Sequence, residues 1–425
     1  MKKQLLLMLF FLIFSLKGND QKINIATQEK EKISINKETQ QRKIPIKNKP
    51  KKQITTQDET KQEIKKTTTK KKEIKEEKKE IVFGQTGSFS GSLKAYSEMI
   101  KTAINTCFKA ANNSGNLANI KLRLESLDDK GQANIAAKNI QKLYKKNKID
   151  MFLGCTGTRG VLKVLPLIES EKIAMFFPWG GDKKLMRPNL THQINGLGLM
   201  APQTEKLINY IVKELRLKKI ALFHSDGDFS VQTAKKTISQ LTKYGISPVK
   251  TASYNRFTMD IESTSKKLIE ADPKIVLCLA TSMPTAKLIN DFFAEGHFGT
   301  LFFGIDSTLF VKKILKDKGD IKFKYSSSVP NPTNDKLAIV KEFQTNLKKY
   351  YPESFEENIN ILSLAYYIQA KIIVEAIKIV DEPITKEKII KAIENMKNFD
   401  LGGFEINFNP LTRYAFGQNI ILIKG

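Results

Sequence analysis

The sequence predicts an α/β fold of two lobes, each with a mostly parallel sheet between helices. Two series of short segments that are apolar throughout predict the two sheets, and segments with helical periodicity separate them. Strands that are apolar on both faces and alternate with helices are typical of parallel sheets. The segments are IVFGQT, IKLRLESLDD, DMFLGCTG and IAMFFPWGG in the first series, and KIALFHSDGD, PVKTASY, KIVLCLA and TLFFGID in the second.

The first 80 residues differ from the rest in composition. Two lysines and an apolar run from Leu5 to Leu16 predict a signal peptide or N-terminal anchor over residues 1–18, because the run is shorter than the ~20 residues of a membrane-spanning helix. This predicts a periplasmic or other extracytoplasmic location, tethered to the inner membrane if the N-terminus is not cleaved. Residues 19–80 are rich in lysine and lack aromatic residues, so we expect a disordered tether. It is either a solvated spacer or a basic arm on an anionic envelope surface.

The net charge of +27 does not by itself predict a nucleic-acid partner. Only seven of the 71 basic residues are arginine, the residue favoured for bidentate contacts to phosphate and guanine. The three histidines are scattered and no metal-ligand spacing or cofactor motif occurs, so we expect neither a metal nor a cofactor. Cys107, Cys155 and Cys278 lie in apolar segments, where we expect buried free thiols; one disulfide plus an odd cysteine is the alternative.

Nearly every apolar segment ends on a small or polar residue. These residues are Thr86, Asp128, Asp129, Thr156, Thr158, Gly180, Gly181, Asp226, Thr281 and Asp306. In open α/β sheets the carboxyl ends of the strands line the ligand crevice, so the sequence predicts a binding protein with the elbow GQTGSFSGS in the crevice wall. Asp128 and Asp129 are expected to cap the helix that follows them, with ligand contact as the alternative.

An enzyme is not expected. GQTGSFSG lacks the GxGxxG spacing of dinucleotide sites, and GSFSGSLK lacks the GxxxxGK[ST] spacing of phosphate loops. The G-x-S-x-G turn that carries a hydrolase nucleophile does not occur at any strand end.

The last part of the chain adds helices and a hairpin-rich end to the two lobes. DKLAIVKEFQTNLKKYY and NILSLAYYIQAKIIVEAIKIV have helical periodicity, whereas LGGFEINFNPLTRYAFGQNIILIKG is typical of hairpins. This order predicts several chain crossings between the lobes. Lobe one is expected to comprise residues 81–199 plus 330–398, and lobe two residues 200–329 plus 399–425.

The stretches GQTGSFSGSLKAY, LESLDDKGQANIAAKNIQKLY, KKIALFHSDGDFS and FDLGGFEINFNP, together with residues 151–188, carry a family resemblance. Their order and spacing over residues 81–425 resemble the type I periplasmic solute-binding proteins of the branched-chain amino-acid (Leu/Ile/Val) class. The resemblance implies two Rossmann-like lobes joined by a multi-strand hinge. It also implies capture of an amino acid or similar small polar solute by hinge closure, and docking on ABC permease subunits in the inner membrane.

The resemblance implies ligand-binding residues in the first lobe. Thr158 stands where a family hydroxyl binds the ligand carboxylate, and Thr156 lies in the same loop. Trp179 stands where a backbone carbonyl meets the ligand ammonium, with packing beneath the lobe as the alternative. Tyr96 matches an aromatic residue at the cleft rim, and Gly181 replaces a second hydroxyl.

Three further site residues are implied in the second lobe. Phe229 matches a tyrosine that closes over the ligand, and Thr281 approximately matches another. Asp306 approximately matches an acid that pairs with the ammonium; capping of the following helix is the alternative. Because the phenol is absent at both Phe229 and Thr281, leucine specificity is not implied. Another amino acid, an aromatic acid, an amide or a small peptide all stay open as ligands.

The long tether keeps a second function open. A freely diffusing receptor has no use for such reach, whereas a membrane-tethered sensor or cell-wall regulatory module does. Such a module would use the same fold for protein contact instead of solute import.

Overall fold

The structure is a computed structural model that describes residues 79–424 except 91–92, 118, 181, 198–199, 257, 316–322 and 417–419. The predicted signal peptide or anchor over residues 1–18, and nearly all of the predicted tether over residues 19–80, lie outside the described residues. Every described residue belongs to one unit, Ile74–Gly425.

The first of two large sheets has five parallel strands in the order β2-β1-β3-β4-β5. Its strands are β1 (Lys79–Gly87), β2 (Ile120–Asp128), β3 (Met151–Leu153), β4 (Ala174–Phe176) and β5 (Gln193–Ile194). Successive side chains of a strand point to opposite faces, so each apolar strand supplies two cores. Phe83 and Phe176 lie in one core, and Phe152 and Met175 lie in the other.

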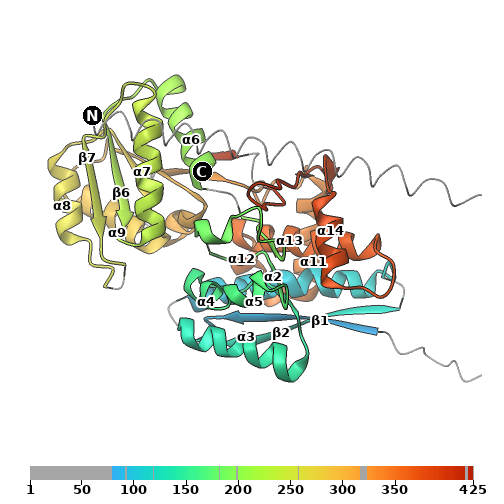
Figure 1. The fold of residues 1–425 in the computed structure, drawn as a ribbon. Coiled ribbons are helices and arrows are strands. Elements are labelled where there is room, and N and C mark those ends of the chain that lie inside the picture. The colour runs from blue at the N-terminus through green and yellow to red at the C-terminus, as the bar shows by residue number, and fades with distance from the viewer. Residues whose placement is uncertain are drawn as a thin grey trace, which may run out of the picture. The chain divides into compact units, whose positions relative to one another are not determined.

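Helices cover both faces of this sheet. The core of Phe83 also contains side chains of α2 (Lys94–Asn113), α11 (Ala338–Tyr350), α13 (Ile361–Lys378) and α14 (Lys386–Glu394). The core of Phe152 contains side chains of α3 (Ala133–Asn147), α4 (Thr158–Lys163) and α5 (Leu165–Glu169). Figure 1 shows α3 on one side of β1 and β2, and α2 and α13 on the other. The amphipathic stripe predicted for the first helix is buried as expected, from Ile100 to Ala111.

The second sheet has six strands in the order β13-β10-β9-β8-β6-β7. All neighbouring pairs are parallel except the antiparallel pair of β10 and β13. Its strands are β6 (Ile220–Ser225), β7 (Lys250–Tyr254), β8 (Ile275–Leu279), β9 (Leu301–Gly304), β10 (Phe323–Ser327) and β13 (Ile421–Lys424). The predicted α/β class with parallel-dominated sheets is confirmed.

The second sheet also lies between two helix layers. One core contains side chains of α6 (Met200–Asn209), the π-helical turn η2 (Tyr210–Glu214) and α7 (Asp228–Thr242). The other contains side chains of α8 (Glu262–Glu270), α9 (Ser282–Ala294) and α10 (Val311–Ile314). The short elements that complete the fold are η1 (Lys183–Leu185), η3 (Asp306–Thr308), η4 (Pro352–Ser354), α12 (Phe355–Asn358), β11 (Phe399–Asp400) and β12 (Glu405–Ile406).

The chain crosses between the two sheets three times: after β5, after β10 and before β13. Residues 79–197 and 328–416 are called here the first half, and residues 200–327 and 420–424 the second half. The last stretch differs from the predicted lobe boundary. Phe404, Ile406, Phe408 and Phe416 pack in the core of the first sheet, and only β13 pairs with the second. Phe408 N also donates to Met396 O at 3.0 Å, two residues beyond the end of α14, which joins this stretch to the first half.

Cys107, Cys155 and Cys278 are buried free thiols, as predicted. Burial raises the pKa of the Cys155 thiol to about 12, so this group stays protonated and unreactive at neutral pH.

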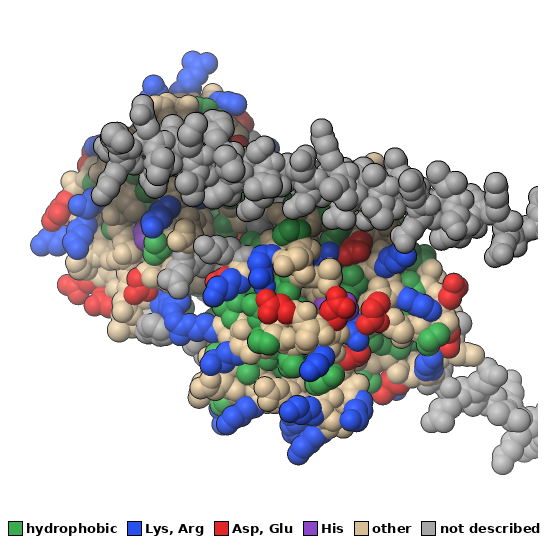
Figure 2. Space-filling model, in the orientation of Figure 1, with side chains coloured by type: hydrophobic (Ala, Val, Ile, Leu, Met, Phe, Trp, Pro, Cys, Tyr) green, Lys and Arg blue, Asp and Glu red, His purple; other side chains and the backbone are tan. Residues whose placement is uncertain are grey.

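Among the described residues no single helix is both long enough and apolar enough to cross a bilayer. One pair bent by 109°, Pro352–Asn358 with Ile361–Lys378, meets that test when taken together. Figure 2 shows lysine and arginine over much of the visible surface with acidic side chains among them.

Candidate functional site

The carboxyl ends of β1 and β2 are joined by the paired acids Asp128 and Asp129. The Thr86 hydroxyl donates to Asp129 Oδ2 at 3.1 Å, and Phe89 N donates to Asp128 Oδ1 at 2.9 Å. The two acids also accept the backbone N–H groups of their own turn, from Lys130 and Gly131. They do not cap α3. The N-cap residue of that helix is Gln132, and its side chain makes no capping hydrogen bond. The capping prediction was therefore wrong: these acids hold the elbow against the end of β2.

Thr156 and Trp179 lie side by side in the loops after β3 and β4. Trp179 N donates to Cys155 O at 2.8 Å, and Gly157 N donates back to Trp179 O at 3.0 Å. The Thr156 hydroxyl is buried and lies 3.2 Å from the Ser97 hydroxyl of α2. The Trp179 carbonyl predicted to meet an ammonium therefore already accepts one bond, and its second lone pair is the one left for a ligand.

Thr158 is the first residue of α4 and lies against Gly180. A Cβ atom on Gly180 would lie 2.8 Å from Thr158 Oγ1 and 3.0 Å from both Thr158 N and Thr158 Cα. The close approach of these two backbones requires glycine. The structure thus brings Tyr96, Thr156, Thr158 and Trp179 to one edge of the first sheet, since Tyr96 also lies there on α2.

Three aromatic rings meet at this edge. The ring of Tyr96 stacks on that of Trp179, with centroids 5.0 Å apart and planes at 18°. The rings of Tyr96 and Phe310 meet edge-to-face, with centroids 5.4 Å apart and planes at 67°. Such offset and edge-on pairs contribute ~0.5–1.5 kcal/mol beyond area burial. Because Phe310 belongs to the second half, this cluster joins the carboxyl edges of the two sheets.

Phe310 was missed in the sequence. It follows β9 by six residues, in the segment STLFVKK that is otherwise typical of a short amphipathic helix. The sequence feature that could have identified it was an aromatic residue shortly after the end of a predicted strand. Trp179 in turn packs against the first core and stacks on Tyr96.

Thr281 is the N-cap of α9 and is exposed, with no side-chain cap bond. The Thr281 side chain hydrogen-bonds Tyr254, whose pKa is raised by burial and partly lowered again by that bond. Phe229 lies in α7, and its side chain is outside what the structure describes. Gly181 lies outside the described residues altogether.

Asp306 is partly buried and bonds to Gln203 through two atoms. Gln203 Nε2 donates to Asp306 Oδ2 at 2.9 Å, and Asp306 N donates to Gln203 Oε1 at 3.0 Å. Gln203 is fully buried at the start of α6, directly after the first crossing. The charge of Asp306 also raises the pKa of Tyr414, which lies just before the third crossing, although burial is the larger cause. Asp306 does not cap η3, whose N-cap is Ile305.

Burial raises the pKa of Asp306 to about 7, against the weaker opposing effect of the Gln203 bond. Since an unfolded aspartate ionises near pH 3.8, the folded chain holds a proton between pH 4 and 7 that the unfolded chain has lost. Stability from this group is therefore lost as the pH rises through that window. We expect Asp306→Asn to unfold at the same urea concentration as the unaltered chain at pH 4, and to be more stable by ~1–3 kcal/mol at pH 8. An equal difference at both pH values would contradict the shift.

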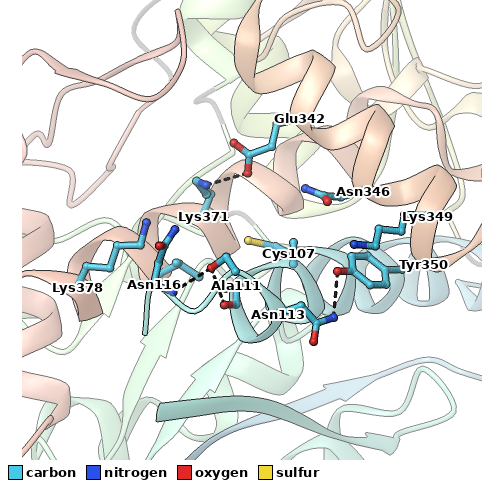
Figure 3. A pocket seen from close by; sticks show the side chains of 13 residues that line it. Cys107, Ala111, Asn113, Asn116, Glu342, Asn346, Lys349, Tyr350, Lys371 and Lys378 are labelled. Carbon is cyan, nitrogen blue, oxygen red and sulfur yellow. Dashed lines mark hydrogen bonds and ion pairs between the residues drawn. The ribbon is translucent and has the colours of Figure 1, made fainter. Parts of the chain in front are cut away.

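A separate cavity of about 350 Å³ lies between α2, α11 and α13 (Figure 3). Lys371 pairs there with Glu342 at 2.7 Å, and Asn113 Nδ2 donates to Tyr350 Oη at 3.0 Å. The residues that line this cavity include none of the predicted site residues. In the described part of the chain no group of three or more His, Cys, Asp or Glu side chains is arranged to hold a metal ion.

Residues 80–418 match the model of a protein family described as periplasmic binding protein. The chain belongs to this family. The family predicted from the sequence is therefore confirmed, as is the fold class. Among solved structures, this periplasmic binding protein is similar to a possible leucine/isoleucine/valine-binding protein from Rhodopirellula baltica, with a TM-score of 0.73 and 21% identity over 81% of this chain and 94% of that one.

Two other solved structures resemble this periplasmic binding protein and carry ligands. A branched-chain amino-acid ABC transporter protein from Thermus thermophilus, with bound valine, has a TM-score of 0.70 and 20% identity over 82% of this chain and 94% of that one. A solute-binding protein from R. palustris, in complex with 4-hydroxybenzoate, has a TM-score of 0.69 and 18% identity over 81% and 93%. At these identities the likeness establishes the fold.

Curated relatives match a shorter part of the chain. A Leu/Ile/Val-binding protein homolog from Brucella melitensis is 21% identical over 197 residues, which are 46% of this chain and 53% of that protein. BraC3 from Rhizobium johnstonii, a Leu/Ile/Val-binding protein, is 22% identical over 170 residues, 40% of this chain and 46% of that one. The matched region thus spans about half the length of these relatives.

Proposed function

We propose that this protein is the extracytoplasmic solute-binding component of an ABC importer. It captures an amino acid or a similar small carboxylate between the carboxyl edges of its two sheets and closes around it by a hinge motion of the three crossings. The closed form then docks on permease subunits in the inner membrane.

The observation that carries the proposal is the contact of Tyr96 with Phe310, because it brings strand-end loops of both sheets to one place. Parallel sheets place ligand sites at their carboxyl edges. When the carboxyl edges of two sheets face each other, a solute between them can bond to polar groups of both sheets. The three crossings of the chain are the segments about which the halves would rotate.

The polar groups at this place suit the two ends of an amino acid. The hydroxyls of Thr156 and Thr158 donate to the solute carboxylate, and the second lone pair of the Trp179 carbonyl accepts from the ammonium. Asp306 supplies the countercharge to that ammonium from the second half. Leaving either charged end of a buried solute unpaired costs ~1–3 kcal/mol, so each contact contributes to selectivity.

An aromatic carboxylate is the second candidate solute. The rings of Tyr96, Trp179 and Phe310 form a cluster that stacks favourably with a planar ligand. The similar protein from R. palustris was solved with 4-hydroxybenzoate, which has a carboxylate and a ring but no ammonium. The two candidates share the threonine hydroxyls and differ in their need for Asp306.

A thermal-shift panel on the full chain tests this function. The panel contains L-leucine, L-valine, L-phenylalanine, leucinamide and 4-hydroxybenzoate. A solute at 100 times its Kd stabilises the fold by ~2.7 kcal/mol, which we expect for at least one carboxylate and for no amide. Thr158→Ala should weaken that binding roughly 5- to 150-fold. No shift with any panel member would contradict import and favour the tethered sensor or cell-wall module.

A further inference from the structure

One hydroxyl of the second half, that of Ser282, joins three segments. Ser282 Oγ donates to Ser307 O at 3.2 Å and accepts from Phe310 N at 3.1 Å. The Tyr96 phenol forms a side-chain hydrogen bond with the same hydroxyl. A serine hydroxyl offers one proton and two lone pairs. One hydroxyl therefore bonds to Ser307, Phe310 and Tyr96.

Ser282 is more deeply buried than Tyr96, Thr281 and Asp306, the predicted site residues around it. It is the first residue of α9, directly after Thr281, and only 1% of its surface is exposed. The Ser307 hydroxyl donates to Ala280 O at 2.8 Å, so the loops after β8 and β9 are bonded to each other on both sides of Ser282. This pair of loops, called here the platform, carries the Phe310 ring that contacts Tyr96 of the first half.

The platform contacts the first half through the rings of Phe310 and Tyr96. The ring centroids of Phe310 and Tyr96 lie 5.4 Å apart, and those of Tyr96 and Trp179 lie 5.0 Å apart. Trp179 in turn pairs with Thr156 in an isolated bridge. A path of direct contacts therefore runs from Ser282 to the loop predicted to bind the solute carboxylate.

We propose that Ser282 is a positioning residue that couples closure of the two halves to the solute site. It holds Phe310 and the Tyr96 phenol in the arrangement in which their rings cover a solute on Thr156 and Thr158. The inference rests on the proposed function for the identity of the site, but the coupling of the two halves does not need a known solute. Without the Ser282 hydroxyl, Phe310 N and the phenol both lose a partner, and the closed arrangement becomes less populated.

Trp179 makes this coupling measurable because it is the only tryptophan of the chain. We expect Ser282→Ala, in the full chain without solute, to raise acrylamide quenching of Trp179 about twofold as the halves separate more often. Ser282→Thr keeps the hydroxyl and should restore the quenching of the unaltered chain. Tyr96→Phe removes only the phenol hydroxyl and should repeat the effect of Ser282→Ala.

Ser265→Ala is the matched control. Ser265 is a buried serine of the same half whose hydroxyl donates to Asp291 at 2.6 Å, away from the Trp179 cluster. We expect it to leave the quenching of Trp179 unchanged. A panel solute should also bind about fivefold more weakly to Ser282→Ala than to the Ser265→Ala control.

Two results would overturn the inference. One is a lower melting temperature of Ser282→Ala with quenching of Trp179 unchanged, which would make the hydroxyl merely structural. The other is unchanged quenching in Tyr96→Phe. Failure of the solute panel is a different outcome: if quenching still rises in Ser282→Ala, the coupling stands and the proposed function fails.

Discussion

Gly180→Ala is expected to weaken solute binding roughly 5- to 150-fold, the equivalent of the ~1–3 kcal/mol that overpacking costs. The added Cβ would lie 3.0 Å from the backbone N and Cα of Thr158, which cannot move aside as a side-chain end can. The strand-end loop that carries Thr158 must therefore shift relative to the loop that carries Gly180. Titration calorimetry with a solute found by the panel measures the effect.

Gly299→Ala is the control for this substitution. A Cβ on Gly299 meets no atom within 4 Å, so it should leave affinity and stability unchanged. Equal affinities of Gly180→Ala and Gly299→Ala would show that the Thr158 loop does not contact the solute.

The second large effect is a pH dependence of amino-acid affinity. With its pKa near 7 in the chain without solute, Asp306 must lose a proton to pair with an ammonium. Affinity for an amino acid should therefore rise about tenfold per pH unit up to pH 7, and level off above it. Calorimetry from pH 5 to pH 8 measures this rise, together with the proton released on binding.

Two controls separate this effect from general changes with pH. A deaminated analogue, which keeps the carboxylate and lacks the ammonium group, should bind with an affinity that does not rise between pH 5 and pH 8, because it does not need the Asp306 charge. Asp306→Asn should bind the amino acid weakly and with a flat profile. If the affinity of the unaltered chain for an amino acid does not change with pH, Asp306 does not pair with the ammonium group. That result would favour an aromatic carboxylate as the solute.

The two-sheet architecture could be predicted because its signals are local. Apolar strands such as IVFGQT and KIVLCLA alternate with amphipathic helices, and each segment carries its own pattern. The buried thiols followed from the same pattern, because Cys107 occupies a core position of its helix. Thr156, Thr158 and Trp179 meet at one edge because parallel strands end on the same side of a sheet.

Contacts between distant segments could not be predicted in this way. Gln203 bonds to Asp306 over 103 positions of the chain, and neither residue carries a local signal for the other. Likewise, the contact of Tyr96 with Phe310 depends on how the two sheets are connected. The hairpin of β11 and β12 pairs with neither large sheet, so only the packing of Phe404 and Phe416 places it with the core of the first sheet.

A crystal structure of the chain with a solute from the panel tests the central claim most directly. The account predicts density for the solute with its carboxylate within hydrogen-bond distance of the Thr156 or Thr158 hydroxyl, and with Phe310 covering it from the second half. Solute density in the cavity between α2, α11 and α13 instead, with the Tyr96–Trp179 stack undisturbed, would contradict it.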